Sequence, residues 1–255
     1  MDIAKLGLLT TLLLGIFILI GAAVALIFKR HEKVVEASIG LAFGVIIMLI
    51  ATELLPEIIH HLGLKHIYIF LIFTIVGFYM LKILDEYIPD HDDEHMTKPE
   101  RKSNLIHIGV MTAIALALHN IIEGMAVYST IITDSNMGLS LLLGIGFHNI
   151  PLGMVITSAL YQGKDNIYKT ILSVIAISSS TFIGGLIMYF LNISALNTII
   201  LGILLSTTLG MLLFITSNEL IPRIKASTNK KVTIISMIVG IVVVLIASLT
   251  HTHHH

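Results

Sequence analysis

The stretch that decides the fold is His119-Asn120-Ile121-Ile122-Glu123-Gly124, which lies inside the apolar run 105–132. His119 and Glu123 are four residues apart, and Asn120 and Glu123 are three apart, so a helix places their side chains along one stripe. An imidazole, an amide oxygen and a carboxylate in this arrangement are a set of ligands for a divalent metal ion. Polar side chains deep in an apolar segment are costly, and they predict a substrate path.

The pattern returns further along the chain as His148-Asn149-Ile150-Pro151-Leu152-Gly153. A single His or Asn in an apolar helix has a simpler explanation, a hydrogen bond to a neighbouring helix. Two His-Asn pairs, one with a Glu at metal-ligand spacing, favour a metal site. We therefore take as candidate metal ligands His119, Asn120, Glu123, His148 and Asn149.

The composition is that of a polytopic membrane protein. Of the 255 residues, 56% are hydrophobic and 12% are charged, and the mean hydropathy is +0.95. The chain has no cysteine, which excludes disulfides and thiolate metal sites. The apolar stretch after Lys5 is too long for a signal-peptide core, so we expect a retained span. The run His251-Thr252-His253-His254-His255 is either a tag remnant or a native tail, and we assign it no function.

Eight apolar runs are long enough to cross a bilayer, which takes about 20 residues each. The sequence therefore predicts an all-α fold with eight transmembrane helices in one transporter-like domain over 1–255, in contact with membrane lipid. The expected spans are about 6–28, 34–59, 66–84, 105–132, 137–161, 167–191, 196–221 and 232–250, with one sizeable loop at about 85–104.

The basic residues predict the orientation of these spans. Alternate loops carry thirteen of the fifteen Lys and Arg residues, and only Lys5 and Lys65 fall on the other side. Because the basic side faces the cytosol, we expect a multi-pass protein of the cell membrane with both termini outside. The basic residues of the inner side are Lys29, Arg30, Lys33, Lys82, Lys98, Arg101, Lys102, Lys164, Lys169, Arg223, Lys225, Lys230 and Lys231.

Two pairs of spans resemble each other although they cross in opposite directions. Span two ends in Glu53-Leu54-Leu55-Pro56-Glu57-Ile58 and span seven in Glu219-Leu220-Ile221-Pro222-Arg223-Ile224, and spans four and five carry the His-Asn motifs. Antiparallel matches of this kind predict an inverted repeat, arranged as 3+2+3 helices. By the same pairing we expect span one to match eight and span three to match six, although those pairs show no clear similarity.

The repeat also predicts where the carboxylates lie. Glu53 falls near the outer end of span two and Glu219 near the inner end of span seven, with the two histidines between them. We take Glu53, Glu57 and Glu219 as gate or pathway candidates, because alternating access needs a site open to each face in turn. The alternative is that they are ordinary interfacial carboxylates. Pro151 predicts a kink beside His148 that frees the Phe147 carbonyl, and Pro56 and Pro222 predict bends beside the glutamates.

Two further features have a structural interpretation beside the functional one. The loop 85–104 holds His91-Asp92-Asp93-Glu94-His95, which is either a solvated charged linker or a loop that receives metal through His91 and His95. The small residues Ala113, Ala115 and Ala117, and the run 178–185, are expected to let helices pack closely.

At these positions the chain resembles the ZIP (ZRT/IRT-like) family of divalent-metal transporters. The family motif of span four, His-Asn-x-x-Asp/Glu-Gly, is matched completely by His119 to Gly124, and spans five and seven add support. The resemblance implies transport of zinc, or of iron, manganese or a related ion, towards the cytosol through a site on spans four and five. It also implies a homodimer. The metal is then substrate rather than cofactor, and we expect no cofactor and no nucleic-acid partner.

The chain departs from the family pattern in two places. Span five has Leu152 where the family usually has a Glu, and span six lacks the Glu that the family usually supplies, with Thr181 as the nearest polar candidate. These residues support one ion bound by His119, Glu123 and His148, with Asn120 and Asn149 assisting. Two other functions stay open, an intramembrane metal-dependent hydrolase and a non-transporting metal-binding relative.

Overall fold

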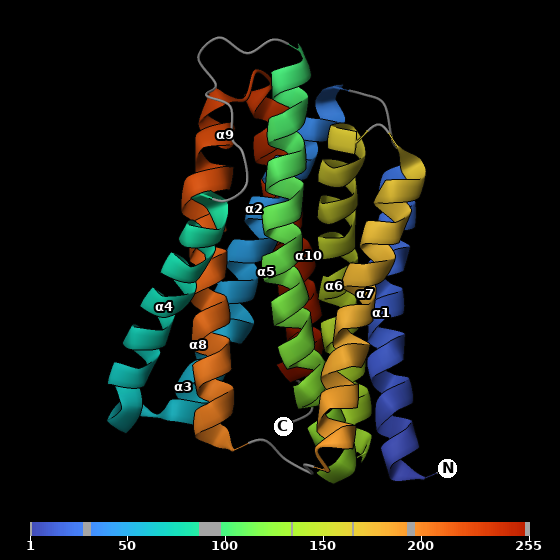
Figure 1. Cartoon of the computed structure of the whole chain (residues 1–255), viewed down its shortest axis with the longest axis vertical. Coiled ribbons are helices and arrows are strands. Elements are labelled where there is room, and N and C mark those ends of the chain that lie inside the picture. The colour runs from blue at the N-terminus through green and yellow to red at the C-terminus, as the bar shows by residue number, and fades with distance from the viewer. Residues whose placement is uncertain are drawn as a thin grey trace.

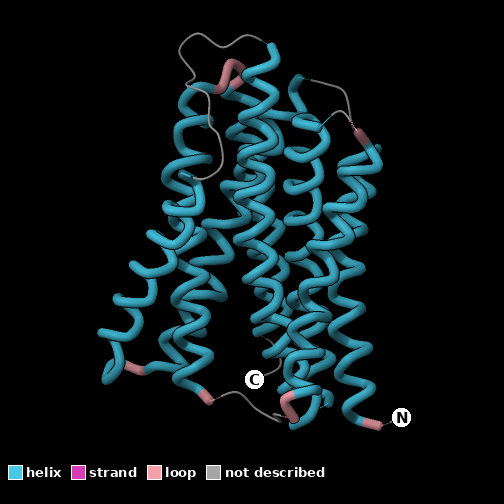
Figure 2. The backbone as a smooth tube through the Cα atoms, viewed as in Figure 1, coloured by secondary structure: helices cyan, strands magenta, loops and turns pink. Residues whose placement is uncertain are grey.

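The structure is a computed structural model, and it describes residues 2–27, 32–86, 98–133, 135–164, 166–192 and 197–252. Within those ranges, side chains are described except at 32–35, 38, 98–112, 137, 140, 141, 144, 147, 148, 151, 155, 159, 162–164 and 247–252. The described residues form helices and short connections and contain no strand, as the fold class predicts. The helices stand side by side in one bundle, and the connections lie at its two ends (Figure 2).

Long helices cross the length of the bundle, and two of them are interrupted (Figure 1). In chain order the elements are α1 (Ile3–Ile27), α2 (Glu32–Leu49), the π-helical η1 (Ile50–Leu54), α3 (Leu55–Leu62), the 3₁₀ turn η2 (Leu64–His66), α4 (Ile67–Glu86), α5 (Lys98–Thr133), α6 (Ser135–Lys164), α7 (Ile167–Phe190), α8 (Thr198–Phe214), the π-helical η4 (Ile215–Leu220), α9 (Ile221–Ala226) and α10 (Lys230–Thr252).

Six stretches of the described residues are long and apolar enough to cross a membrane. They are Ile3–Ile27, Ile39–Leu62, Leu64–Glu86, Ala113–Thr133, Ile167–Phe190 and Thr198–Ala226. Each coincides with an expected span. The expected spans 137–161 and 232–250 fall on α6 and α10, which include residues whose side chains are not described. The structure thus shows a helical membrane protein, and the eight-span arrangement is taken up under the proposed function.

Polar side chains and one glycine set several helix ends. The Asn166 side chain accepts hydrogen bonds from the backbone N–H groups of Tyr168 and Lys169, and the Asn197 side chain accepts one from Ile199. Both begin a helix by satisfying N–H groups that have no partner in its first turn. Gly63 ends α3 with φ +60°, a conformation that costs other residues more than glycine. The chain therefore turns sharply there and returns as α4.

Each of the two π-helical segments contains a pathway glutamate and ends two residues before a proline. In η1 the Leu55 N–H donates to the Ile50 carbonyl, and in η4 the Ile221 N–H donates to the Thr216 carbonyl, each five residues back. Pro56 and Pro222 follow directly and have no N–H to donate. A π-turn before each proline absorbs the lost hydrogen bond. The helix type thus changes beside both glutamates, and the bends expected there stay predictions.

Among the described residues, ten glycines bring helices into close backbone contact; Gly15 faces Ser178 and Gly40 faces Thr233, and the other eight form reciprocal contacts in four pairs of helices. A Cβ on any of them would overlap a backbone carbonyl oxygen of the facing helix, so only glycine fits. The glycine and the facing residue are Gly21 and Ile150, Gly153 and Ile18 (α1 with α6); Gly124 and Thr181, Gly184 and Ile121 (α5 with α7); Gly44 and Met237, Gly240 and Leu41 (α2 with α10); Gly77 and Thr207, Gly210 and Thr74 (α4 with α8).

The run of small residues in α7 packs as the sequence predicts. Thr181 is fully buried, and its hydroxyl donates to the Thr11 carbonyl of α1 at 3.0 Å. A Cβ on Gly185 would meet the Thr11 side chain, and one on Gly184 would meet α5. The interpretation of this run as a packing surface is confirmed for these residues.

Candidate metal site

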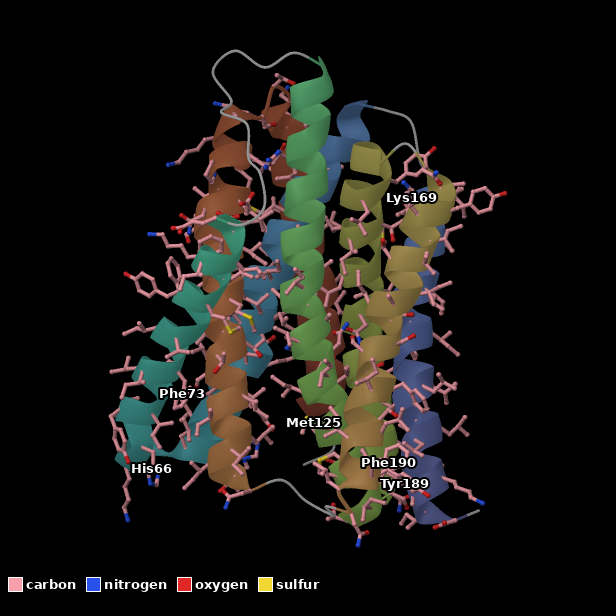
Figure 3. The ribbon with its side chains drawn as sticks, viewed as in Figure 1. His66, Phe73, Met125, Lys169, Tyr189 and Phe190 are labelled. Carbon is pink, nitrogen blue, oxygen red and sulfur yellow. The ribbon has the colours of Figure 1, made fainter. Side chains whose placement is uncertain are left out.

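The central pair of the site lies on α5. The His119 Nε2 atom is 2.7 Å from the Glu123 Oε1 atom, and the two side chains are 3% and 8% exposed. This contact follows from the four-residue spacing on a continuous helix, and it confirms that the two side chains share one stripe. Met125 follows Glu123 by two residues on α5. In Figure 3 it lies between the end of the bundle that carries His66 and the end that carries Lys169.

Two buried amides accompany this pair. Asn120 on α5 is 1% exposed and Asn149 on α6 is fully buried. Among the described residues, the Asn120 Oδ1 atom and both polar atoms of the Asn149 side chain are buried without a hydrogen-bond partner. Buried amides are nearly always satisfied, so oxygens left over in this way are suited to a cation that supplies the missing interaction.

The geometry of the pair suits a divalent ion. Zinc bonds to imidazole nitrogen and carboxylate oxygen at about 2.0–2.2 Å, so two ligand atoms of one tetrahedral zinc lie about 3.4 Å apart. The His119 and Glu123 atoms now touch at 2.7 Å. A metal ion can therefore replace their direct contact after a side-chain movement of less than about 1 Å. The His119 and Glu123 atoms are thus close enough together to bind one cation.

Other candidates are placed with less detail. The backbone of His148 and Pro151 lies in α6, which is a continuous helix, but their side chains and that of Phe147 lie outside the described residues. The kink at Pro151 and a role for the Phe147 carbonyl stay predictions. The loop histidines His91 and His95 also lie outside the described part of the chain.

The three glutamates expected along the pathway differ in burial. Glu219 lies in η4 and is 9% exposed, Glu53 lies in η1 and is half-buried, and Glu57 in α3 is exposed. η1 leads into α3 at one end of the bundle, and η4 leads into α9 at the other (Figure 1). One carboxylate therefore lies towards each end, and the buried Glu219 is not an ordinary surface group.

The positions that depart from the family pattern are filled by packing. Leu152 is 1% exposed and belongs to the main hydrophobic core. Thr181, the polar candidate of span six, uses its hydroxyl to join α7 to α1. Neither residue supplies a charged ligand.

The structure also shows a cluster that sequence reasoning missed. Glu57, His60 and His61 on α3 bring one carboxylate oxygen and one nitrogen of each imidazole within 4.8 Å of one another. It is the one group of three or more such ligands that the described residues assemble. The signal in the sequence was the spacing of three and four residues after Glu57, which a helix turns to one side.

Known proteins similar to this chain are zinc transporters. Relatives named "Zinc transporter ZupT" include those of Clostridium perfringens, 26% identical with 94% of each chain covered, Streptococcus mutans, 25% identical with 94% of this chain and 95% of the relative covered, and Chlorobium luteolum, 27% identical with 96% and 98% covered. These relatives are transporters and not enzymes, so the hydrolase alternative has no support.

The family itself is decided by a match to a family model over more than half of the chain. A model of the family described as "ZIP Zinc transporter" matches residues 85–248, which include α5, α6 and both His-Asn motifs. A buried His-Glu pair in a helical membrane protein is thus found within a region that matches a known transporter family. The chain belongs to the ZIP zinc transporter family.

Proposed function

We propose that this chain carries divalent transition-metal cations, zinc foremost, across the cell membrane towards the cytosol. The single observation that carries the proposal is the buried contact of His119 with Glu123 in a chain of the ZIP family. Imidazole with carboxylate suits zinc, and iron, manganese, cobalt and nickel accept the same ligands. The metal is substrate, and one carboxylate leaves it incompletely neutralised, which favours release.

The proposed site joins α5 to α6. His119, Asn120 and Glu123 come from α5, and Asn149 and His148 come from α6. The two buried amide oxygens without described partners support this assignment, because a cation between the helices would interact with both oxygens. We infer one ion at this site, since the position of the second carboxylate is held by the buried Leu152.

Eight spans in a 3+2+3 inverted repeat form the proposed framework. The glycine contacts in the four helix pairs support it. If α1 is exchanged with α7, α2 with α8, α4 with α10 and α5 with α6, each of these four pairs becomes another of the four. Under this exchange Glu53 corresponds to Glu219 and Pro56 to Pro222. The contacts favour pairing span one with six and span three with eight, not the pairing expected from sequence.

One symmetric pair of hydrogen bonds supports the same exchange. The Thr52 hydroxyl donates to the Met48 carbonyl, and the Asn218 side-chain amide donates to the Phe214 carbonyl, each four residues back. Thr52 lies four residues before Pro56, and Asn218 lies four residues before Pro222. Two π-turns with matching side-chain bonds give spans two and seven the same local distortion, so the proposed carriers of Glu53 and Glu219 are built alike.

Uptake into vesicles tests the function. We expect His119→Ala or Glu123→Ala to reduce radiolabelled zinc and iron uptake to the level of protein-free vesicles, because each removes a ligand that the ion cannot replace in an apolar bundle. His91→Ala and His95→Ala serve as controls and should change uptake only modestly. Undiminished uptake by the Glu123 variant would refute the site, and zinc binding without flux by the parent would identify a non-transporting relative.

A further inference from the structure

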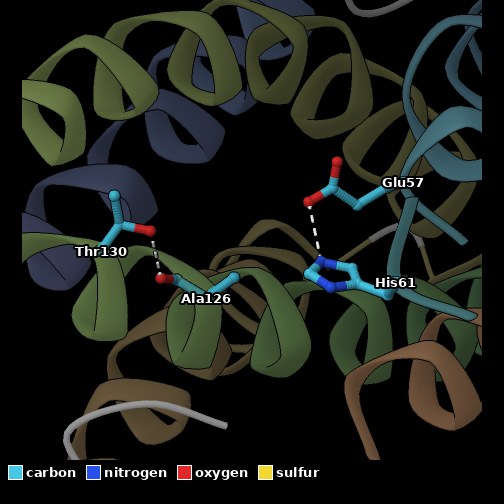
Figure 4. A network of polar contacts seen from close by, with 4 residues as sticks. All are labelled: Glu57, His61, Ala126 and Thr130. Atoms are coloured by element: carbon cyan, nitrogen blue, oxygen red, sulfur yellow. Dashed lines mark hydrogen bonds and ion pairs between the residues drawn. The ribbon is translucent and has the colours of Figure 1, made fainter. Parts of the chain in front are cut away.

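The short helix α3 presents three metal-binding side chains at one end of the bundle. The His61 Nε2 atom lies 3.1 Å from the Glu57 Oε1 atom (Figure 4), and the rings of His60 and His61 meet edge to face with centroids 5.1 Å apart. Figure 4 shows the Glu57 and His61 side chains pointing towards one another from α3. The three groups form a set distinct from the α5 pair.

The local fold holds these side chains together. α3 continues directly from η1, whose π-turn accommodates the N–H that Pro56 lacks, and Gly63 ends the helix with its positive φ. Within the helix, spacings of three and four residues turn His60 and His61 to the side of Glu57. Both histidines fall in the last turn, where the negative end of the helix dipole favours a bound cation.

The burial of the cluster suits an ion that comes from solution. The Glu57 side chain is 55% exposed, whereas the His61 side chain is 14% exposed. The His61 Nδ1 atom is buried without a hydrogen-bond partner among the described residues. The imidazole as a whole is half-buried, and its Nε2 atom is the one that faces Glu57. A polar atom buried without a partner is costly, so a ring rotation that brings Nδ1 to a bound ion beside Glu57 is favourable. The exposed carboxylate gives that ligand access.

The donor set matches a releasable zinc site. Two imidazoles and one carboxylate are three protein ligands, and sites that exchange their ion or water keep the fourth position open. Ligand atoms of one tetrahedral zinc lie about 3.4 Å apart, so atoms within 4.8 Å need to close by at most about 1.4 Å. Side-chain torsions supply that movement on an exposed helix end.

We propose that Glu57, His60 and His61 form a second divalent-metal site that takes zinc from the outer solution before it enters the bundle. The inference rests on the proposed transport function and on the proposed orientation, in which the end carrying α3 and His66 faces outward (Figure 3). The cluster lies just beyond η1, which carries the half-buried Glu53. An ion held there is concentrated at the mouth of the pathway.

Zinc stoichiometry and uptake kinetics test this site together. Zinc is titrated calorimetrically into the purified full chain, with the histidines of 85–104 and 251–255 replaced by asparagine in every sample so that they bind none. We compare the parent, the double variant His60→Ala/His61→Ala, Glu57→Gln as an isosteric second probe, and His66→Ala. His66 is a histidine of the same bundle end that lies outside the cluster.

We expect the parent and the His66 variant to bind two zinc ions per chain. The double variant should bind one, with affinity for the other lowered by about 100-fold or more, since even the loss of an outer-shell partner costs about 10- to 100-fold. Its zinc uptake should show a raised KM and an unchanged maximal rate, as expected when only initial binding is lost. If both α3 variants still bind two zinc ions per chain with the affinities of the parent, or if both keep the KM of the parent, the proposal is overturned.

A Glu123→Gln sample separates this proposal from the proposed function. If both hold, it retains the zinc of α3 but transports none. If it transports as the parent does, the α5 site is wrong, and the zinc count of the α3 variants still decides whether the cluster binds metal.

Discussion

At the scale of single residues, the proposed symmetry sets Glu123 opposite Leu152. Both follow a His-Asn pair by the same number of residues, and both precede a glycine that touches a backbone carbonyl. One half of the proposed site therefore offers a carboxylate and the other an apolar side chain. The asymmetry lowers the negative charge facing the ion, which weakens binding and speeds release.

Restoring the second carboxylate should change binding and turnover in opposite directions. We expect Leu152→Glu to raise zinc affinity by about tenfold or more, as one added charged ligand gives at least about 1.4 kcal/mol, and to lower the maximal uptake rate. Calorimetry and zinc flux in liposomes measure the two quantities. Leu160→Glu is the control, because Leu160 is equally buried on α6 two turns away. A similar gain in the control would contradict the account.

The His119–Glu123 contact was predictable from sequence because it depends on neighbours within one helix turn. The position of Glu219 in a buried π-turn was not, since burial depends on helices distant in the sequence. His60 and His61 were missed for another reason. In the sequence their stretch has the pattern of the end of an apolar span, and only the helical turn of α3 brings their imidazoles beside the Glu57 carboxylate.

At the scale of helices, glycine contacts hold the bundle in pairs. Backbone approach of this kind allows strong van der Waals packing where no hydrophobic effect drives helices together. The candidate ligands lie in the pairs α1 with α6 and α5 with α7. Each of the other two pairs, α2 with α10 and α4 with α8, contains one helix, α2 or α8, that leads into a π-helical segment. These pairings join residues far apart in the chain, so sequence patterns alone did not reveal them.

An alanine at one of these contacts should separate its helix pair. A Cβ on Gly77 would overlap the Thr207 carbonyl, so we expect Gly77→Ala to cost about 1–3 kcal/mol, as overpacking does, and to lower the melting temperature in detergent. Gly7→Ala is the matched comparison, because its Cβ would meet side-chain atoms of Tyr128 and Ile131 and no backbone atom, so it should cost less. Equal melting temperatures for the two variants would show that the contact is not tight.

At the scale of the whole molecule, the number of spans and the positions of the first and last helix ends can be compared with the topology predicted from the sequence. Six of the eight predicted spans correspond to described stretches that are long and apolar enough to cross a membrane, because length and apolar composition identify such segments from sequence. α1 begins and α10 ends at the same end of the bundle (Figure 1), which agrees with an even number of crossings. Whether that end faces outward depends on the loop charges, and the homodimer implied by the family resemblance stays a prediction.

The absence of cysteine makes the orientation directly measurable. We expect a membrane-impermeant maleimide to label Lys65→Cys in intact cells, because Lys65 is exposed beside His66 at the end predicted to face outward. Lys169→Cys, exposed at the opposite end (Figure 3), should react only after permeabilisation. The reverse pattern would invert the proposed topology and move the α3 cluster to the cytosolic side.

The most direct test of the central claim is the position of zinc in crystals of the zinc-loaded protein, measured by anomalous diffraction at the zinc edge. We predict a peak about 2.0–2.2 Å from both the His119 Nε2 atom and a Glu123 carboxylate oxygen, with the amide oxygens of Asn120 or Asn149 beside it. Ordered zinc found only elsewhere, with His119 and Glu123 still in direct contact, would contradict it.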